Sequence, residues 1–155
     1  MSTLPELVAP ITSDLRQPDN RFDVIKGIEY LKPKDEKFAP GSSWDMGDWA
    51  TKTAAGAVQP PVTTGVANTY PVIVGNTQYD SQATGQLTLA IGGGFIYRTS
   101  KFVAGSYVEG NNLTVKDLGG GERVPSLASG GDAILARVYT APDAKGVMEI
   151  LVLDR

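Results

Sequence analysis

The chain contains no cysteine and no histidine among its 155 residues. Without cysteine there can be no disulfide bond and no thiolate nucleophile, and without either residue type the usual zinc sites cannot form. The absence of histidine also removes the side chain most often used for acid–base catalysis near neutral pH. These absences exclude several large enzyme classes, and the lack of cysteine agrees with synthesis in a reducing cytoplasm.

An excess of either charge is also missing, because 14 basic residues face 17 acidic ones. Nine acidic and seven basic residues precede position 61, and eight acidic and seven basic residues lie beyond position 60. No basic stripe is present that could neutralise phosphates, so we expect no nucleic-acid partner. No apolar run approaches the length of a membrane span, and the first residues, MSTLPELVAP, lack the features of a signal peptide. We therefore expect no membrane partner.

Proline and glycine divide the chain into two halves. Eight of the ten prolines lie at or before Pro71, and thirteen of the eighteen glycines lie at or after Gly75. Because proline cannot donate to a sheet ladder, the first half is poor in candidate strands. We predict an extended, irregular N-terminal arm over residues 1–69 that contains one short strand near residues 22–31.

The second half predicts a mainly β fold, a small antiparallel β-barrel or sandwich over about residues 70–153, within a domain that spans residues 70–155. Short segments rich in β-forming residues alternate with glycine turns there. The last segment is apolar at nearly every position, which is typical of a central or well-covered strand. The expected strands are 70–74, 86–91, 95–100, 113–116, 133–140 and 147–153.

Several patterns suggest chemistry but are better explained without it. The glycine runs 92–94 and 119–121 lack the Lys-Ser/Thr pair and the helix of a phosphate-binding loop, so we interpret them as turns. The carboxylates of Asp35, Glu36, Asp45 and Asp48 lack the spacing of a calcium loop. Ser100 and Lys101 are neighbours on an expected strand and would point to opposite faces. The sequence thus predicts no catalytic, cofactor-binding or metal-binding residue, and no enzyme.

Four aromatic residues are the candidates for an interface. Trp44 and Trp49 are flanked by acidic residues in a segment without periodicity, where an indole needs a surface to bury against. They could equally fill one end of the protein's own core. Phe38 and Tyr30, from the same half of the chain, complete the set of interface candidates.

The stretch from about residue 70 to residue 153 resembles head decoration (cement) proteins of tailed bacteriophages. Four phrases carry the resemblance: DSQATGQLTL (80–89), YRTSKF (97–102), GDAILARV (131–138) and GVMEILVL (146–153). The resemblance covers a little over half of the chain and includes no catalytic motif. It implies a structural protein that binds the outer face of an assembled capsid and stabilises it.

The same resemblance implies the partners and the location. The major capsid protein would be the main partner, and the protein would associate with itself, as a trimer rather than a dimer, because many capsid lattices offer local threefold positions. It would reside on the capsid exterior of the virion after assembly in the host cytoplasm. An extended arm suits such docking, because it covers more area than a compact face.

Two other functions remain open from the sequence. One is a different phage structural protein, such as a tail-tube, baseplate or head-completion protein, with residues 32–69 as a long loop. The other is a carbohydrate-binding β module that uses Trp44, Trp49 and Tyr79 as a stacking platform.

Overall fold

The computed structural model describes residues 22–38, 46–54, 57–59, 68–74, 85–117 and 123–154. Apart from the 3-10 turn η2 (Ile28–Tyr30), its regular elements are β-strands. They are β1 (Asp23–Lys26), β2 (Pro33–Phe38), β3 (Trp49–Lys52), β4 (Ala57–Gln59), β5 (Thr69–Val74), β6 (Gln86–Ala90), β7 (Ile96–Thr99), β8 (Asn112–Asp117), β9 (Arg123–Leu127), β10 (Ala136–Thr140) and β11 (Met148–Val152). The prediction of a mainly β fold is confirmed.

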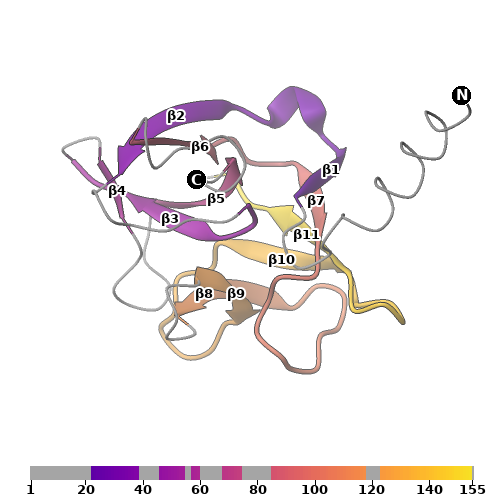
Figure 1. Cartoon of the computed structure of the whole chain (residues 1–155). Helices are drawn as coiled ribbons and strands as arrows, with labels where there is room; N and C mark the ends of the chain where they lie inside the picture. Colours follow the sequence, from indigo (N-terminus) through magenta and orange to yellow (C-terminus); the bar gives the residue numbers. More distant parts are fainter. Residues whose placement is uncertain are drawn as a thin grey trace, which may run out of the picture.

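The strands form two groups, which Figure 1 shows packed against each other. Five strands pair in a ring, in the order β2-β4-β3-β5-β6 and back to β2. Six strands form a second sheet in the order β1-β7-β11-β10-β8-β9. All pairs are antiparallel except that of β2 with β4.

The strands predicted in the second half are present, but the glycine run 92–94 does not close a hairpin between two of them. β6 belongs to the ring and β7 to the six-stranded sheet, so this run crosses from one group to the other. A side chain at Gly92 would collide with the carbonyl oxygen of Tyr30, and one at Gly93 with the backbone of Asp154. The glycines are therefore required because three backbone segments pass close together.

Strand β9 was not predicted, because Pro125 interrupts its pattern. Proline is tolerated in a sheet mainly at an edge, and β9 is the last strand in the order of its sheet. The carbonyl oxygen of Pro125 accepts a hydrogen bond from the backbone N–H of Val103, at 2.9 Å.

The irregular arm predicted for residues 1–69 is wrong wherever the structure describes that region. The short strand expected near residues 22–31 is β1, but β2, β3 and β4 also lie before residue 69. β1 pairs with β7 and β2 pairs with β6, so the first half of the chain supplies strands to both groups. The expected division at residue 70 therefore does not separate an arm from a β domain. Residues 1–21 lie outside the described residues.

Strand β11 lies in the middle of the six-stranded sheet, between β7 and β10, as its apolar sequence predicted. Its side chains nevertheless alternate: Met148, Ile150 and Val152 are buried, whereas Glu149 and Leu151 are partly exposed. One face of the sheet is thus packed on the core, and the other carries polar groups.

Two apolar cores share the wall made by β3, β5 and β6. Alternate residues of β3 face opposite sides, so Trp49 enters the main core under the six-stranded sheet while Ala50 enters the smaller core inside the ring. Ala90 and Leu89 divide in the same way on β6. The ring is therefore packed directly on the sheet.

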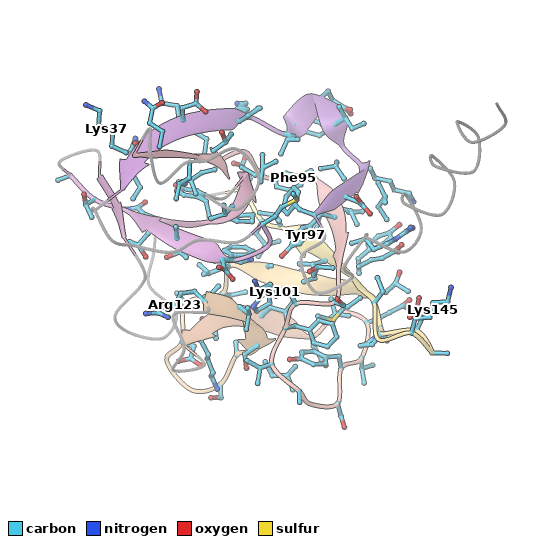
Figure 2. The ribbon with its side chains drawn as sticks, in the orientation of Figure 1. Lys37, Phe95, Tyr97, Lys101, Arg123 and Lys145 are labelled. Atoms are coloured by element: carbon cyan, nitrogen blue, oxygen red, sulfur yellow. The ribbon has the colours of Figure 1, made fainter. Side chains whose placement is uncertain are left out.

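Buried polar contacts join the two groups of strands at this wall. The indole N–H of Trp49 donates to the hydroxyl of Tyr97 at 3.1 Å, and both residues have no exposed surface. Tyr97 lies near the centre of the molecule in Figure 2, and its ring stacks on that of Phe22, with the ring centroids 4.4 Å apart. The ammonium group of Lys101 lies 2.9 Å from a carboxylate oxygen of Asp48, and both side chains are almost fully buried.

We predict that Tyr97 makes stability depend on pH above pH 10. Burial raises the pKa of the Tyr97 phenol well above its ordinary value of 10, more than the hydrogen bond from Trp49 lowers it. The folded state therefore holds this proton more tightly than the unfolded state, so the stabilisation is complete below about pH 10 and is lost as the pH rises further. The loss should approach about 1.4 kcal/mol per pH unit. Urea unfolding between pH 9 and pH 11 measures this slope.

The Tyr97→Phe variant isolates the effect, because it keeps the ring and removes the ionisable group. We expect it to be less stable than wild type at neutral pH by about 1–3 kcal/mol, since the indole N–H of Trp49 loses its acceptor, and to show a flatter slope above pH 10. Tyr30→Phe, at an exposed position, serves as the control. Identical slopes for all three proteins would contradict the assignment.

Candidate interaction surface

The structure places two of the four interface candidates, Trp49 and Tyr30, and describes their side chains. Trp49 is fully buried inside the protomer, so its assignment to an interface is wrong and the alternative of a core position is correct. Trp44 lies outside the described residues, and Phe38 ends β2 with its side chain outside the description. Tyr30 is 55% exposed and is the candidate that remains.

Tyr30 belongs to the crossover that connects the six-stranded sheet to the ring. After β1, Gly27 adopts a left-handed conformation with φ of 78°, and a side chain there would collide with the backbone at Gly94 and Phe95. The chain then makes the single turn η2, which the backbone hydrogen bond from Tyr30 to Gly27 closes at 2.9 Å. Lys32 follows, and its carbonyl oxygen accepts from Ile91 at 3.0 Å. Both ends of the turn are thereby fixed to the body of the protein.

Ile28 and Tyr30 form what we call the η2 surface. Ile28 is 66% exposed, which is more than any other large apolar residue that the structure describes. The ring of Tyr30 lies beside Gly94, where an added side-chain carbon would make only an ordinary van der Waals contact with it. Two large apolar groups held in water on a fixed turn make a candidate contact site, since covering their exposed surface would contribute about 1–2 kcal/mol for each.

Sequence reasoning selected Tyr30 but missed Ile28. Both were included in the strand predicted near residues 22–31, in which alternate residues would have been buried. Gly27 is the signal that could have placed both residues outside the strand, because an isolated glycine inside a strand pattern suggests a bulge or a close approach of another backbone segment.

The other exposed apolar residues are more dispersed. Val108 is 63% exposed and Ile134 42% exposed, and each lies in a loop. Tyr139 is 38% exposed, but its hydroxyl accepts a hydrogen bond from the ammonium of Lys26 at 2.9 Å, and that ammonium also lies 5.1 Å from the ring centroid. The hydrogen bond to Tyr139 is the main reason that the pKa of Lys26 is raised. The hydroxyl of Tyr139 thus has a polar partner within the chain. Among the described residues, the structure gives no hydrogen bond to the side chain of Tyr30.

The acidic residues considered for calcium have protein partners instead. Asp35 accepts a hydrogen bond from the hydroxyl of Thr88 at 2.7 Å, and Glu36 lies 3.3 Å from the ammonium of Lys52. Asp48 is paired with Lys101, as described above, and Asp45 lies outside the described residues. Within the part of the chain that the structure describes, no three acidic side chains gather as metal ligands would.

The Ser100–Lys101 pair is also separated by its contacts. Lys101 turns toward Asp48, and its backbone N–H donates to the hydroxyl of Thr99 at 2.9 Å. Among the described residues, no helix has the length and apolar character needed to cross a membrane.

Comparison with known proteins adds no relative to this picture, because no family model, curated protein or solved structure matches the chain.

We predict that substitution by alanine has a large effect on stability at Trp49 and almost none at Tyr30. Trp49→Ala should cost about 3–5 kcal/mol of unfolding free energy, because it opens a cavity at the wall between the two cores. Tyr30→Ala should change the unfolding free energy by no more than about 0.5 kcal/mol, because its ring is mostly in water. Urea denaturation of both variants measures the difference. A large loss for Tyr30→Ala would mean that its ring supports the fold.

Proposed function

We propose that the protein is a non-enzymatic capsid decoration protein of a tailed bacteriophage, which binds the outer face of the capsid and stabilises it. The observation that carries the proposal is the η2 surface: Ile28 and Tyr30 stand exposed on a turn that is fixed between two packed groups of strands. Binding through such a surface needs shape and apolar area rather than a reactive group. The major capsid protein is the proposed partner.

The sequence resemblance supports the proposal from a second direction. Three of its four phrases fall on β7 and the loop that follows, on β10 with the residues before it, and on β11. β7, β11 and β10 are consecutive neighbours in the six-stranded sheet, so these three segments lie side by side. The fourth phrase ends on β6, and its first residues lie outside the description.

The burial of Trp49 argues against one of the two alternative functions and does not bear on the other. The carbohydrate-binding module loses a member of its stacking platform, because Trp49 is buried in the core. A tail-tube, baseplate or head-completion protein would also bind other virion proteins through an apolar surface. We therefore retain it as the second candidate, to be separated by experiment.

We predict that the purified protein sediments with phage heads from which the native decoration has been removed. The double variant Ile28→Ser/Tyr30→Ser should bind at least about 10-fold more weakly, since it removes apolar area worth more than 1.4 kcal/mol from the contact. Occupancy on heads, measured by quantitative gel analysis after sedimentation, gives the result.

The matched control is Val108→Ser/Ile134→Ser, which removes two exposed apolar side chains from other loops. It should bind as wild type does. Sedimentation of the wild-type protein with tails rather than heads would support the second candidate, and sedimentation with neither would reject both.

We further propose that the protein forms trimers, a preference that follows from the resemblance. In the six-stranded sheet, β1 and β9 are the edges, and an edge strand presents backbone groups that another chain can pair with. Analytical ultracentrifugation at tens of micromolar should show a trimer for the wild type and for the Ile28→Ser/Tyr30→Ser variant alike. A strictly monomeric wild type would remove the self-association.

A further inference from the structure

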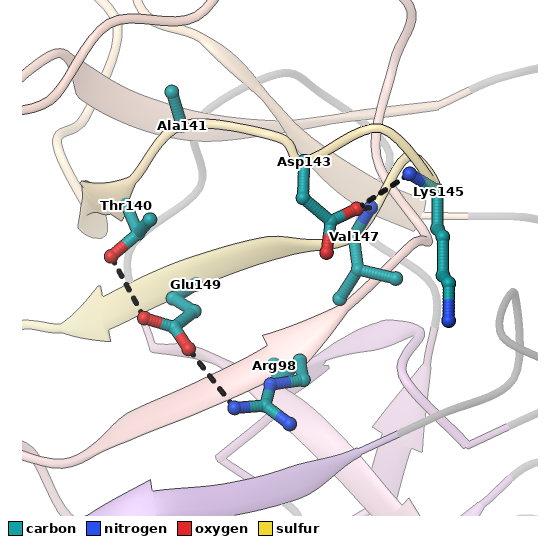
Figure 3. A pocket seen from close by; sticks show the side chains of 7 residues that line it. All are labelled: Arg98, Thr140, Ala141, Asp143, Lys145, Val147 and Glu149. Atoms are coloured by element: carbon teal, nitrogen blue, oxygen red, sulfur yellow. Dashed lines mark hydrogen bonds and ion pairs between the residues drawn. The ribbon is translucent and has the colours of Figure 1, made fainter.

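A recess of 340 Å³ lies at the side of the six-stranded sheet, beside the connection between β10 and β11. Arg98 on β7, Thr140 on β10 and Glu149 on β11 form one side, and Asp143, Lys145 and Val147 form the other (Figure 3). It is open to solvent and has the size of one or two side chains, which suits a point of contact on a protein surface rather than an enclosed ligand site.

The two carboxylates of the recess are already held by the protein. Glu149 accepts from the hydroxyl of Thr140 at 2.8 Å and from the guanidinium of Arg98 at 3.2 Å, one bond on each oxygen. Asp143 accepts from the backbone N–H groups of Lys145 and Val147 at 2.8 and 3.0 Å, which fixes the turn. The hydrogen bond from Val147 is the main reason that the pKa of Asp143 is lowered, so this group is an anion at neutral pH.

The two cations of the recess, Arg98 and Lys145, have N–H donors that form no hydrogen bond in the contacts described. A guanidinium carries five N–H donors in a planar fork, and the contact of Arg98 with Glu149 engages one of its nitrogens. The side chain of Arg98 is 41% exposed. Among the described contacts of Lys145, the backbone N–H forms a hydrogen bond, whereas the ammonium forms none. Both cations line the same recess, and the charges of both contribute to lowering the pKa of Asp143.

We infer that this recess accepts a carboxylate side chain, Asp or Glu, from a loop of the protein's partner. The free donors of Arg98 and Lys145 would bind the carboxylate, in the manner in which a guanidinium and an ammonium commonly bind acidic groups. Val147 offers an apolar surface for the methylene groups of the same side chain. The resident carboxylates of Asp143 and Glu149 repel any incoming anion, and this repulsion is smaller for a singly charged carboxylate than for a more highly charged group such as a phosphate.

A carboxylate on a docking loop is a better occupant than a free small anion. In an open recess, water and salt weaken each charge pair, so a free anion would be held only weakly. A loop that is already held by another contact brings its side chain to the site at a high effective concentration. The identity of the partner rests on the proposed function, which makes it an acidic loop of the capsid surface, whereas the preference for a carboxylate rests on the recess itself.

The decisive experiment compares two charge reversals at exposed lysines far apart on the molecule. Lys145→Glu places a negative charge in the recess, and Lys37→Glu makes the same change on β2, at the opposite side of the molecule in Figure 2. We expect Lys145→Glu to weaken binding to stripped heads about 10-fold or more, since like charges would then face each other across the contact. Lys37→Glu should stay within about 2-fold, and Lys145→Gln should fall between them.

Binding is measured at 50 and 300 mM salt, and the difference between the two lysine reversals should shrink at the higher concentration. Equal losses for Lys145→Glu and Lys37→Glu would overturn the inference, because they would reflect net charge alone. Wild-type binding by Lys145→Glu would overturn it as well, while leaving the proposed function intact.

A second measurement does not depend on heads. Titration of the isotope-labelled protein with N-acetylglutamate amide should shift the backbone amide signals of Val147 and Glu149, and N-acetylglutamine amide at the same concentration should not. Failure of the wild type to bind heads, together with these shifts, would reject the proposed partner and support the carboxylate site. Equal shifts with the two probes would overturn the site.

Discussion

The hydrogen bond between the indole of Trp49 and the hydroxyl of Tyr97 is the contact on which the arrangement of the whole molecule depends. Trp49 lies on β3 of the five-stranded ring, and Tyr97 lies on β7 of the six-stranded sheet. Because both groups are fully buried, neither can replace this bond with water, and either left alone would carry an unsatisfied polar atom. The bond therefore helps to fix how the five-stranded ring packs on the six-stranded sheet, and the ion pair of Lys101 with Asp48 adds a second link.

This junction explains why the turn η2 is held in one position. The chain passes between the sheet and the ring at η2 and again at residues 91–95, and the two crossings touch at Gly27, Gly92 and Gly94. On this turn, Ile28 and Tyr30 are exposed to water.

Much of the second half could be predicted from the sequence, because its strands are short, rich in β-forming residues and bounded by glycine. The first half could not, for a physical reason that β2 illustrates: its residues PKDEKF show no apolar alternation, and it is a strand because β6 pairs with it along five residues. Trp49 presents the same difficulty. An indole in an aperiodic segment can face its own core or a partner, and the outcome depends on Tyr97, which lies 48 residues away in the chain.

The two surfaces proposed for binding would each contribute little binding energy, and this suits the proposed trimer, which would attach to the capsid in many copies. Two apolar side chains contribute a few kcal/mol when covered, and a carboxylate in the recess contributes about 1 kcal/mol or less. Neither alone would hold a protein on a particle at low concentration, because association costs more than either contact returns. In a trimer on a repeating lattice each contact is made three times, and once one subunit is bound the others rebind before they diffuse away. Weak surfaces on a rigid protomer are therefore sufficient, provided that the junction of Trp49 and Tyr97 keeps them in a constant relative position.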